Sequence, residues 1–132
     1  MIGLVLVSHG DVAAALKRAA EHVVGAQAQM ISIAIEPQGE EAQDRARILA
    51  AIEEVNDPAG VILLTDMYGG TPSNLAFSCL KAGQVDVIAG VNLPLLIKLC
   101  QIRKTASLAV AVEAALDAGR GYIKAGSEIL GL

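Results

Sequence analysis

The sequence predicts an α/β domain, a doubly wound three-layer fold around a mostly parallel sheet with the strand order 2-1-3-4. Short uncharged runs of aliphatic residues alternate with longer stretches of helical periodicity, which is typical of parallel strands joined by helices. The first run, residues 2–7, contains no polar residue, so both of its faces are expected to be buried. Of all residues, 54% are hydrophobic but only 2% are aromatic, which requires a core of Val, Ile, Leu and Ala.

Each element is recognised by its pattern and by the residues that end it. Residues 30–35 and 61–64 repeat the aliphatic pattern of the first run. After Gly119-Arg120-Gly121, residues 122–124 are expected to form a short last strand. In full, strands are expected at residues 2–7, 30–35, 61–64, 85–90 and 122–124, and helices at residues 12–24, 40–55, 71–81, 92–103 and 107–118.

Capping residues support these helix boundaries. Asp11 is expected to cap the first helix and Gly25 to end it, while Thr71 as cap, followed by Pro72, is a favourable start for the third. An acidic run begins the second helix, where it complements the helix dipole, and we interpret it as a solvated face. That run is Glu40, Glu41 and Asp44, and the inward residues of the same helix are expected to be Ile48, Leu49 and Ile52.

Composition excludes several classes of protein. The 132 residues suit a single domain over residues 1–132, and a net charge of −4 without a basic cluster argues against nucleic acid as a partner. No apolar run approaches the roughly 18 residues of a membrane span. The amino terminus lacks the basic region of a signal peptide. Cys79 and Cys100 have no CxxC spacing and are expected to be reduced core thiols, so a cytoplasmic location is expected.

Polar residues follow the strands at one edge of the expected sheet. His9 comes after the first strand and Asp66 after the third, and these strands are neighbours in the order 2-1-3-4. A carboxylate that accepts a hydrogen bond from Nδ1 fixes the tautomer of a neutral imidazole and leaves Nε2 free as a nucleophile. We therefore expect His9 and Asp66 to be the catalytic residues.

The residues around this pair suit a phosphoryl group. Gly69 and Gly70 provide backbone N–H groups and Thr71 provides a hydroxyl at a helix start, which together favour an anion. Gly10 is expected to join them in phosphoryl binding, with Ser8 and Asn92 on the rim. The sequence has no Walker lysine and no carboxylate cluster for Mg²⁺, so no metal and no cofactor is expected. His22 has no partner motif and is expected to be structural.

Three motifs resemble those of the mannose-type enzyme IIA domains of the bacterial phosphoenolpyruvate-dependent sugar phosphotransferase system. They are Val5-Leu6-Val7-Ser8-His9-Gly10, Leu64-Thr65-Asp66-Met67-Tyr68-Gly69-Gly70-Thr71-Pro72-Ser73-Asn74 and Ala89-Gly90-Val91-Asn92-Leu93-Pro94. The resemblance implies a phosphotransferase in which His9 accepts a phosphoryl group at Nε2 from the phosphocarrier HPr and passes it to an enzyme IIB for sugar uptake. Asp66 matches the histidine's partner, and Thr71 matches a position near the phosphoryl group.

The same resemblance implies a homodimer whose last short strand exchanges between subunits, and a membrane permease as an indirect partner only. The best-known members continue into a IIB domain that this sequence does not contain. A separate IIB and a regulatory phosphorelay that moves no sugar are therefore both alternatives. A third is the phosphodonor domain of dihydroxyacetone kinase, although the stretch from Gly69 to Asn74 favours the mannose type.

Two other classes of protein fit the sequence less well. A histidine phosphatase would need an Arg directly before the histidine, where Ser8 stands. A receiver-like module with Asp66 as acceptor would need an acidic pair after the first strand, where Ser8 and His9 stand instead.

Overall fold

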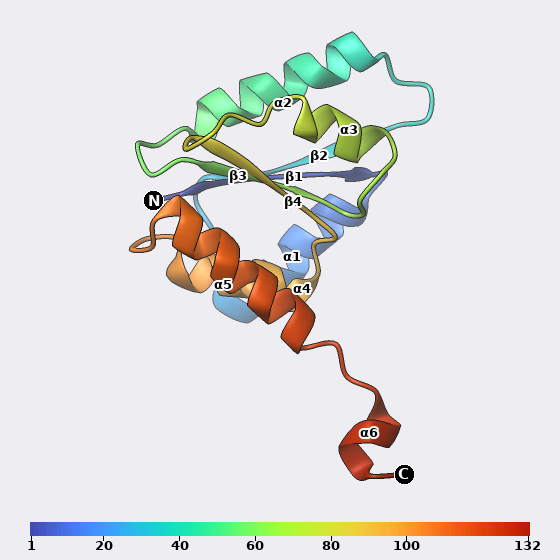
Figure 1. Cartoon of the computed structure of the whole chain (residues 1–132). Helices are drawn as coiled ribbons and strands as arrows, with labels where there is room; N and C mark the ends of the chain where they lie inside the picture. Colours follow the sequence, from blue (N-terminus) through green and yellow to red (C-terminus); the bar gives the residue numbers. More distant parts are fainter.

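A computed structural model describes residues 1–132, and its four parallel strands form one sheet with helices on both faces (Figure 1). The strand order is β2-β1-β3-β4, as the sequence predicts. No helix is long and apolar enough to span a membrane. In chain order the elements are β1 (Gly3–His9), α1 (Val12–Val24), β2 (Met30–Ile35), α2 (Glu41–Val55), β3 (Val61–Thr65), α3 (Thr71–Phe77), β4 (Val85–Ala89), α4 (Leu93–Ile102), α5 (Leu108–Gly121) and α6 (Gly126–Leu130).

Strand β1 lies in the centre and pairs with a neighbour on each side. Val7 is opposite Ile33 of β2 and Thr65 of β3, and His9 is opposite Ile35 at the end of β2. Because all four strands are parallel, their carboxyl ends lie at one edge of the sheet. The loops that follow the four strands therefore lie at the same edge as His9, and those after β2 and β3 flank it because β2 and β3 are the neighbours of β1.

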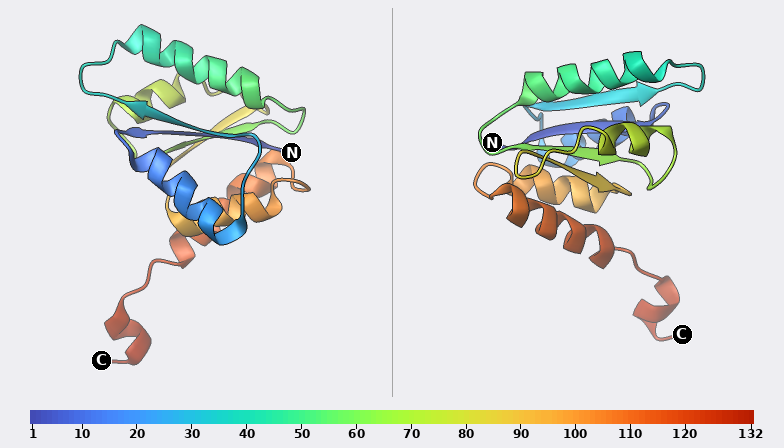
Figure 2. Two further views of the ribbon diagram at one scale, coloured as in Figure 1. Left: turned by 180° about the vertical axis from the view of Figure 1, so that it is seen from behind. Right: turned by 45° about the horizontal axis from the view of Figure 1, so that its top comes forward.

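The core consists of two aliphatic layers, one on each face of the sheet. Side chains of a strand alternate between faces, so Leu4 and Leu6 join the layer under α1, α4 and α5, and Val5 and Val7 join the layer under α2. Figure 2 shows α2 and α3 on one side of the sheet and the other long helices on the opposite side. All four of these strand residues are 0% exposed, as expected for a central strand of a covered parallel sheet.

Helix α3 is shorter than predicted and ends at Phe77 instead of Lys81. The backbones of Lys81 and Val85 exchange hydrogen bonds of 3.0 and 2.8 Å, so the chain after Phe77 turns back toward β4. The hydroxyl of Ser78 also donates to the carbonyl of Leu75 at 2.6 Å, which helps to end the helix. At the other end, the cap is Gly70 and not Thr71, which is the first helical residue.

Two further side chains do not behave as predicted. Asp11 occupies the cap position of α1, but its side chain makes no capping hydrogen bond. The hydroxyl of Ser8 accepts from the N–H of Ala13 instead, at 2.7 Å. Leu49 is 40% exposed on α2, whereas Ile48 and Ile52 are buried as expected.

The carboxyl-terminal segment leaves the domain. The prediction of a strand at residues 122–124 is wrong for the single chain: α5 continues to Gly121, and the short helix α6 follows an extended stretch (Figure 1). Gly119 does not end α5 but lies within it, and it packs closely against α4, where a Cβ would lie 3.0 Å from Leu95 Cδ1. Ile123, Ile129 and Leu130 are between 65% and 74% exposed, so this segment buries little of its apolar surface within one chain.

Candidate functional site

The turn after β1 presents His9 to solvent. Strand β1 is buried up to Ser8, whereas the His9 side chain is 51% exposed. Gly10 has φ +48°, a left-handed conformation that suits glycine and lets the chain turn directly into α1. Ser8, predicted on the rim, is instead 1% exposed and holds this turn from the inside: its hydroxyl lies 3.2 Å from the carbonyl oxygens of both His9 and Gly10 and accepts from Ala13 N–H.

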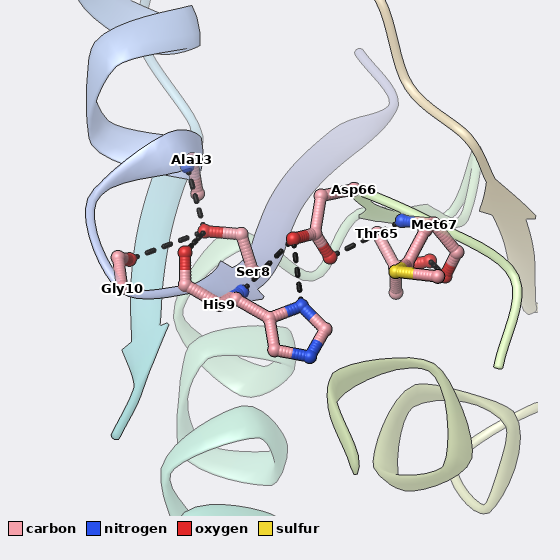
Figure 3. A network of polar contacts seen from close by, with 7 residues as sticks. All are labelled: Ser8, His9, Gly10, Ala13, Thr65, Asp66 and Met67. Carbon is pink, nitrogen blue, oxygen red and sulfur yellow. Dashed lines mark hydrogen bonds and ion pairs between the residues drawn. The ribbon is translucent and has the colours of Figure 1, made fainter. Parts of the chain in front are cut away.

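The side chains of His9 and Asp66 meet across the neighbouring ends of β1 and β3 (Figure 3). His9 Nδ1 lies 2.8 Å from Asp66 Oδ2, and the same oxygen accepts from the backbone N–H of His9 at 3.1 Å. The other carboxylate oxygen accepts from the N–H of Met67 at 3.2 Å. Asp66 is thus held by two backbone groups and is only 14% exposed, which fixes the position of the ring. The predicted pairing is confirmed.

The second ring nitrogen has no hydrogen-bond partner in the protein and faces the loop after β3. A Cβ placed on Gly70 would lie 3.3 Å from both Nε2 and Cε1 of His9, so a larger residue here would crowd the nitrogen. Gly69 and Gly70 have φ of +89° and +84°, and their backbone N–H groups donate to no protein acceptor. The N–H of Thr71 is also unpaired. This loop therefore carries three unpaired backbone donors, and its Gly70 lies next to Nε2; such a set of donors suits an anion.

A cleft of about 480 Å³ opens beside His9, between the loop after β2 and the start of α3. Of the residues predicted to bind the phosphoryl group, Gly10 and Thr71 line this cleft, whereas Gly69 and Gly70 do not; Asn92, predicted on the rim, does not line it either. The remaining lining residues are Ile35, Glu36, Pro37, Gly39, Glu41, Asp44 and Pro72.

Asn92 therefore does not belong to the rim of this cleft. It opens α4 as predicted, with its Oδ1 accepting from Leu95 N–H at 3.0 Å and its Nδ2 donating to the carbonyl of Gly119 at 2.9 Å. Both polar atoms are used in joining α4 to α5, so the residue is a helix cap with a structural role.

One wall of the cleft is acidic, which the sequence interpretation missed. Glu36, Glu41 and Asp44 line it, although the acidic start of α2 is predicted to be a solvated face. Asp44 is 6% exposed and accepts from Arg47 at 3.3 Å, and Arg47 also donates to the carbonyl of Ala34 at 3.1 Å. The strand order could have predicted this acidic wall, because a helix that follows a parallel strand starts at the carboxyl edge of the sheet. The start of α2 therefore lies at the same edge as His9.

The other reactive side chains lie away from this site. His22 is exposed in the last turn of α1, at the opposite edge of the sheet from His9. Cys79 and Cys100 are both free and buried, and burial raises the pKa of the Cys100 thiol. No group of three or more His, Cys, Asp or Glu side chains is placed to hold a metal ion.

Comparison with known proteins gives consistent matches. The family described as "PTS system fructose IIA component" matches residues 3–116. The chain is 32% identical over 110 residues to the fructose-specific EIIA component of the phosphotransferase system (PTS) of Bacillus subtilis strain 168, covering 82% of this chain and 75% of that protein. It is also 32% identical over 127 residues to the mannose-specific EIIAB component of Escherichia coli K12, covering 94% of this chain but only 39% of that longer protein.

The fold is shared with solved structures as well. A crystal structure of phosphotransferase system component EIIA from Streptococcus agalactiae superposes with a TM-score of 0.87 at 21% identity, covering 97% of this chain and 99% of that chain. At this level of identity the match shows a common fold.

Proposed function

The chain belongs to the mannose-type EIIA family of the PTS, and on that premise we propose that it is a phosphoryl carrier in sugar uptake that works through His9. His9 Nε2 accepts the phosphoryl group from phosphorylated HPr and later passes it to an enzyme IIB. The observation that carries the proposal is the 2.8 Å contact between Nδ1 and Asp66, because it leaves the lone pair of Nε2 free.

Each group at the site has a distinct part in the transfer. When Nε2 attacks the phosphorus, the bond between phosphorus and the donor breaks as the new bond to Nε2 forms. The ring then becomes positively charged, and the Asp66 carboxylate stabilises that charge through Nδ1–H. We assign the phosphoryl oxygens to the N–H groups of Gly69, Gly70 and Thr71, which have no protein acceptor. In the second half of the cycle the enzyme IIB attacks the same phosphorus, and the neutral imidazole is restored.

Mapping the phosphorylated residue tests this proposal. Incubation with phosphoenolpyruvate, enzyme I and HPr should give one acid-labile, base-stable phosphoryl group on His9. His9→Ala should abolish the label, and His22→Ala, the matched control, should retain it. Persistent labelling of the His9→Ala variant would overturn the assignment.

We also propose that the protein is a homodimer in which the carboxyl-terminal segment of each chain packs on the other. Strand β4 is an edge strand, and an unpaired edge together with an exposed apolar tail favours association. Truncation after Arg120 should give a monomeric or aggregating protein in sedimentation experiments. If the full-length protein sediments as a monomer at micromolar concentration, this assembly is wrong.

A further inference from the structure

Exposed apolar side chains lie on the loop after β3, which also holds Asp66 and Gly70, and at and just beyond the end of α3. Met67 and Tyr68 are 54% and 79% exposed, and Phe77 and Leu80 are 41% and 48% exposed. We call these four residues the aromatic patch. The rings of Tyr68 and Phe77 pack edge to face, with their centroids 5.9 Å apart. The chain has only two Tyr and one Phe, so two of its three aromatic rings lie on this surface and not in the core.

Part of the patch lies on the loop that also contacts His9. Tyr68 lies midway along the loop that begins with Asp66, the partner of Nδ1, and ends with Gly70, next to Nε2. A typical protein interface buries about 800 Å² on each partner, which is far larger than this loop. A protein that brings a phosphoryl group to Nε2 therefore covers Tyr68 while it does so.

The composition of the patch is that of a binding hot spot. Isolated exposed apolar residues are normal on a protein surface, but aromatic side chains are enriched at the centres of interfaces. The edge-to-face contact with Phe77 already orders the Tyr68 ring, so less rotamer freedom is lost when a partner binds.

The charge of this edge indicates the chemistry of the partner. The loops after the four strands, residues 10–11, 36–40, 66–70 and 90–92, contain Asp11, Glu36, Glu40 and Asp66 but no Lys or Arg. Such an edge repels nucleic acid and anionic lipid surfaces and attracts a protein with basic side chains.

We propose that the aromatic patch is the docking surface for the protein that donates the phosphoryl group to His9, and that this donor presents an apolar centre flanked by Lys or Arg. The inference rests on the proposed function of His9 as phosphoryl acceptor. Tyr68 is the central contact, and the acidic loops guide the approach of the donor.

Substitution at Tyr68 separates docking from chemistry. The rate of His9 labelling is measured against the concentration of phosphorylated HPr, and separately with phosphoramidate, a small donor that needs no docking surface. Tyr68→Ala should raise the half-saturating concentration of phosphorylated HPr by about tenfold or more, as for an interface hot spot, with little change in the maximal rate. Labelling by phosphoramidate should be unchanged, which also shows that the variant is folded.

Two controls and a salt series complete the test. Tyr68→Phe keeps the ring and should restore the wild-type half-saturating concentration. Val23→Ala shortens another exposed apolar side chain, at the far end of α1, and should have no effect. Raising the NaCl concentration should raise the half-saturating concentration of the wild-type protein, because salt screens the charges of the two surfaces.

Each adverse outcome points to one of the two proposals. An unchanged half-saturating concentration for Tyr68→Ala overturns the docking surface. Labelling of the wild type by phosphoramidate but not by phosphorylated HPr overturns HPr as the donor in the proposed function. A half-saturating concentration that does not respond to salt overturns the basic character of the donor. If neither donor labels His9 in the wild type, the proposed function itself fails.

Discussion

The two edges of the sheet use their polar side chains differently. At the carboxyl edge, His9 is half exposed and one of its two ring nitrogens has no protein partner. At the amino edge, Arg103 is 1% exposed and four acceptors surround its guanidinium group. Nη1 donates to the carbonyls of Ile2 and Gln29, at 3.3 and 3.0 Å. Nη2 donates to the carbonyl of Ala28 and to Gln27 Oε1. Both side chains join loops that are distant in the sequence, but only His9 keeps a reactive atom available.

The difference follows from the partners that each edge supplies. Arg103 has no carboxylate partner, and its burial among neutral carbonyls lowers the pKa of the guanidinium. Its carbonyl partner Gln29 has φ +51°, an uncommon conformation for a residue other than glycine. Arg103 thus holds the start of β2 against the start of β1. A single fold therefore places a structural clamp at one edge and a reactive site at the other.

The largest expected effect concerns the carboxylate at the reactive edge. Asp66→Asn should slow phosphoryl transfer to His9 by roughly 10²–10⁴-fold while the fold is retained. The new amide can donate to Nδ1, which favours the tautomer with hydrogen on Nε2 and so blocks the nucleophile. Nitrogen NMR of the imidazole and labelling rates measure the two effects.

Asp11→Asn is the matched control for Asp66→Asn. Asp11 lies at the same edge, but its side chain makes no hydrogen bond to the ring or to the helix start. With phosphoramidate, a small donor that needs no docking surface, this variant should be labelled at close to the wild-type rate. A wild-type rate for Asp66→Asn would mean that the contact with Nδ1 does not control the reactivity of Nε2.

The clamp at the amino edge should affect stability and not chemistry. Arg103→Met removes the donor shared by the carbonyls of Ile2, Ala28 and Gln29, of which that of Ile2 is buried, and should lower the free energy of unfolding by about 2–4 kcal/mol. Urea unfolding measures the loss, and phosphoramidate labelling of His9 under native conditions should be unaffected. Arg18→Met, at an exposed position without hydrogen bonds, is the control and should change the stability by less than about 0.5 kcal/mol. Equal midpoints for the wild type and Arg103→Met would show that the clamp contributes nothing.

The sequence predicts the reactive edge better than the amino edge, for a physical reason. Aliphatic runs give the strands, and the parallel order places the residues after β1 and β3 side by side, so the pairing of His9 with Asp66 can be inferred. The contacts of Arg103 join residues more than seventy positions apart and involve backbone carbonyls, which leave no mark in the pattern of side chains.

The errors at the site itself come from local geometry that periodicity does not contain. The Ser8 hydroxyl is used inside the turn, by the carbonyls of His9 and Gly10 and the N–H of Ala13. Asn92 uses both of its polar atoms, in the helix cap and in the contact with Gly119. The segment at residues 122–124 is a different case. A strand needs a partner edge, and no edge lies within reach of this segment in the single chain.

The smallest expected effect also lies at the amino edge and depends on pH. The Asp57 carboxylate accepts from the N–H of Ala59 at 2.9 Å and from the amino-terminal ammonium of Met1 at 3.0 Å, and these contacts hold the pKa of Asp57 below its ordinary value. Because the pKa is lowered in the folded state, the ionised carboxylate stabilises the fold above the unfolded-state pKa. This contribution is lost as the pH falls through the folded-state pKa.

The variant Asp57→Asn tests the contribution of this ion pair to stability, and Arg103→Met serves as the comparison because its larger effect should not depend on pH. The amide oxygen of Asn can still accept from Ala59, so the variant removes chiefly the charge. The wild type should be slightly more stable than the variant in urea at pH 7, and the difference should disappear in strong acid, below the range in which Asp57 titrates. The deficit of Arg103→Met should persist there, because its partners are carbonyls that do not titrate. An Asp57→Asn deficit that is the same at both pH values would assign the contribution of Asp57 to hydrogen bonding and not to its charge.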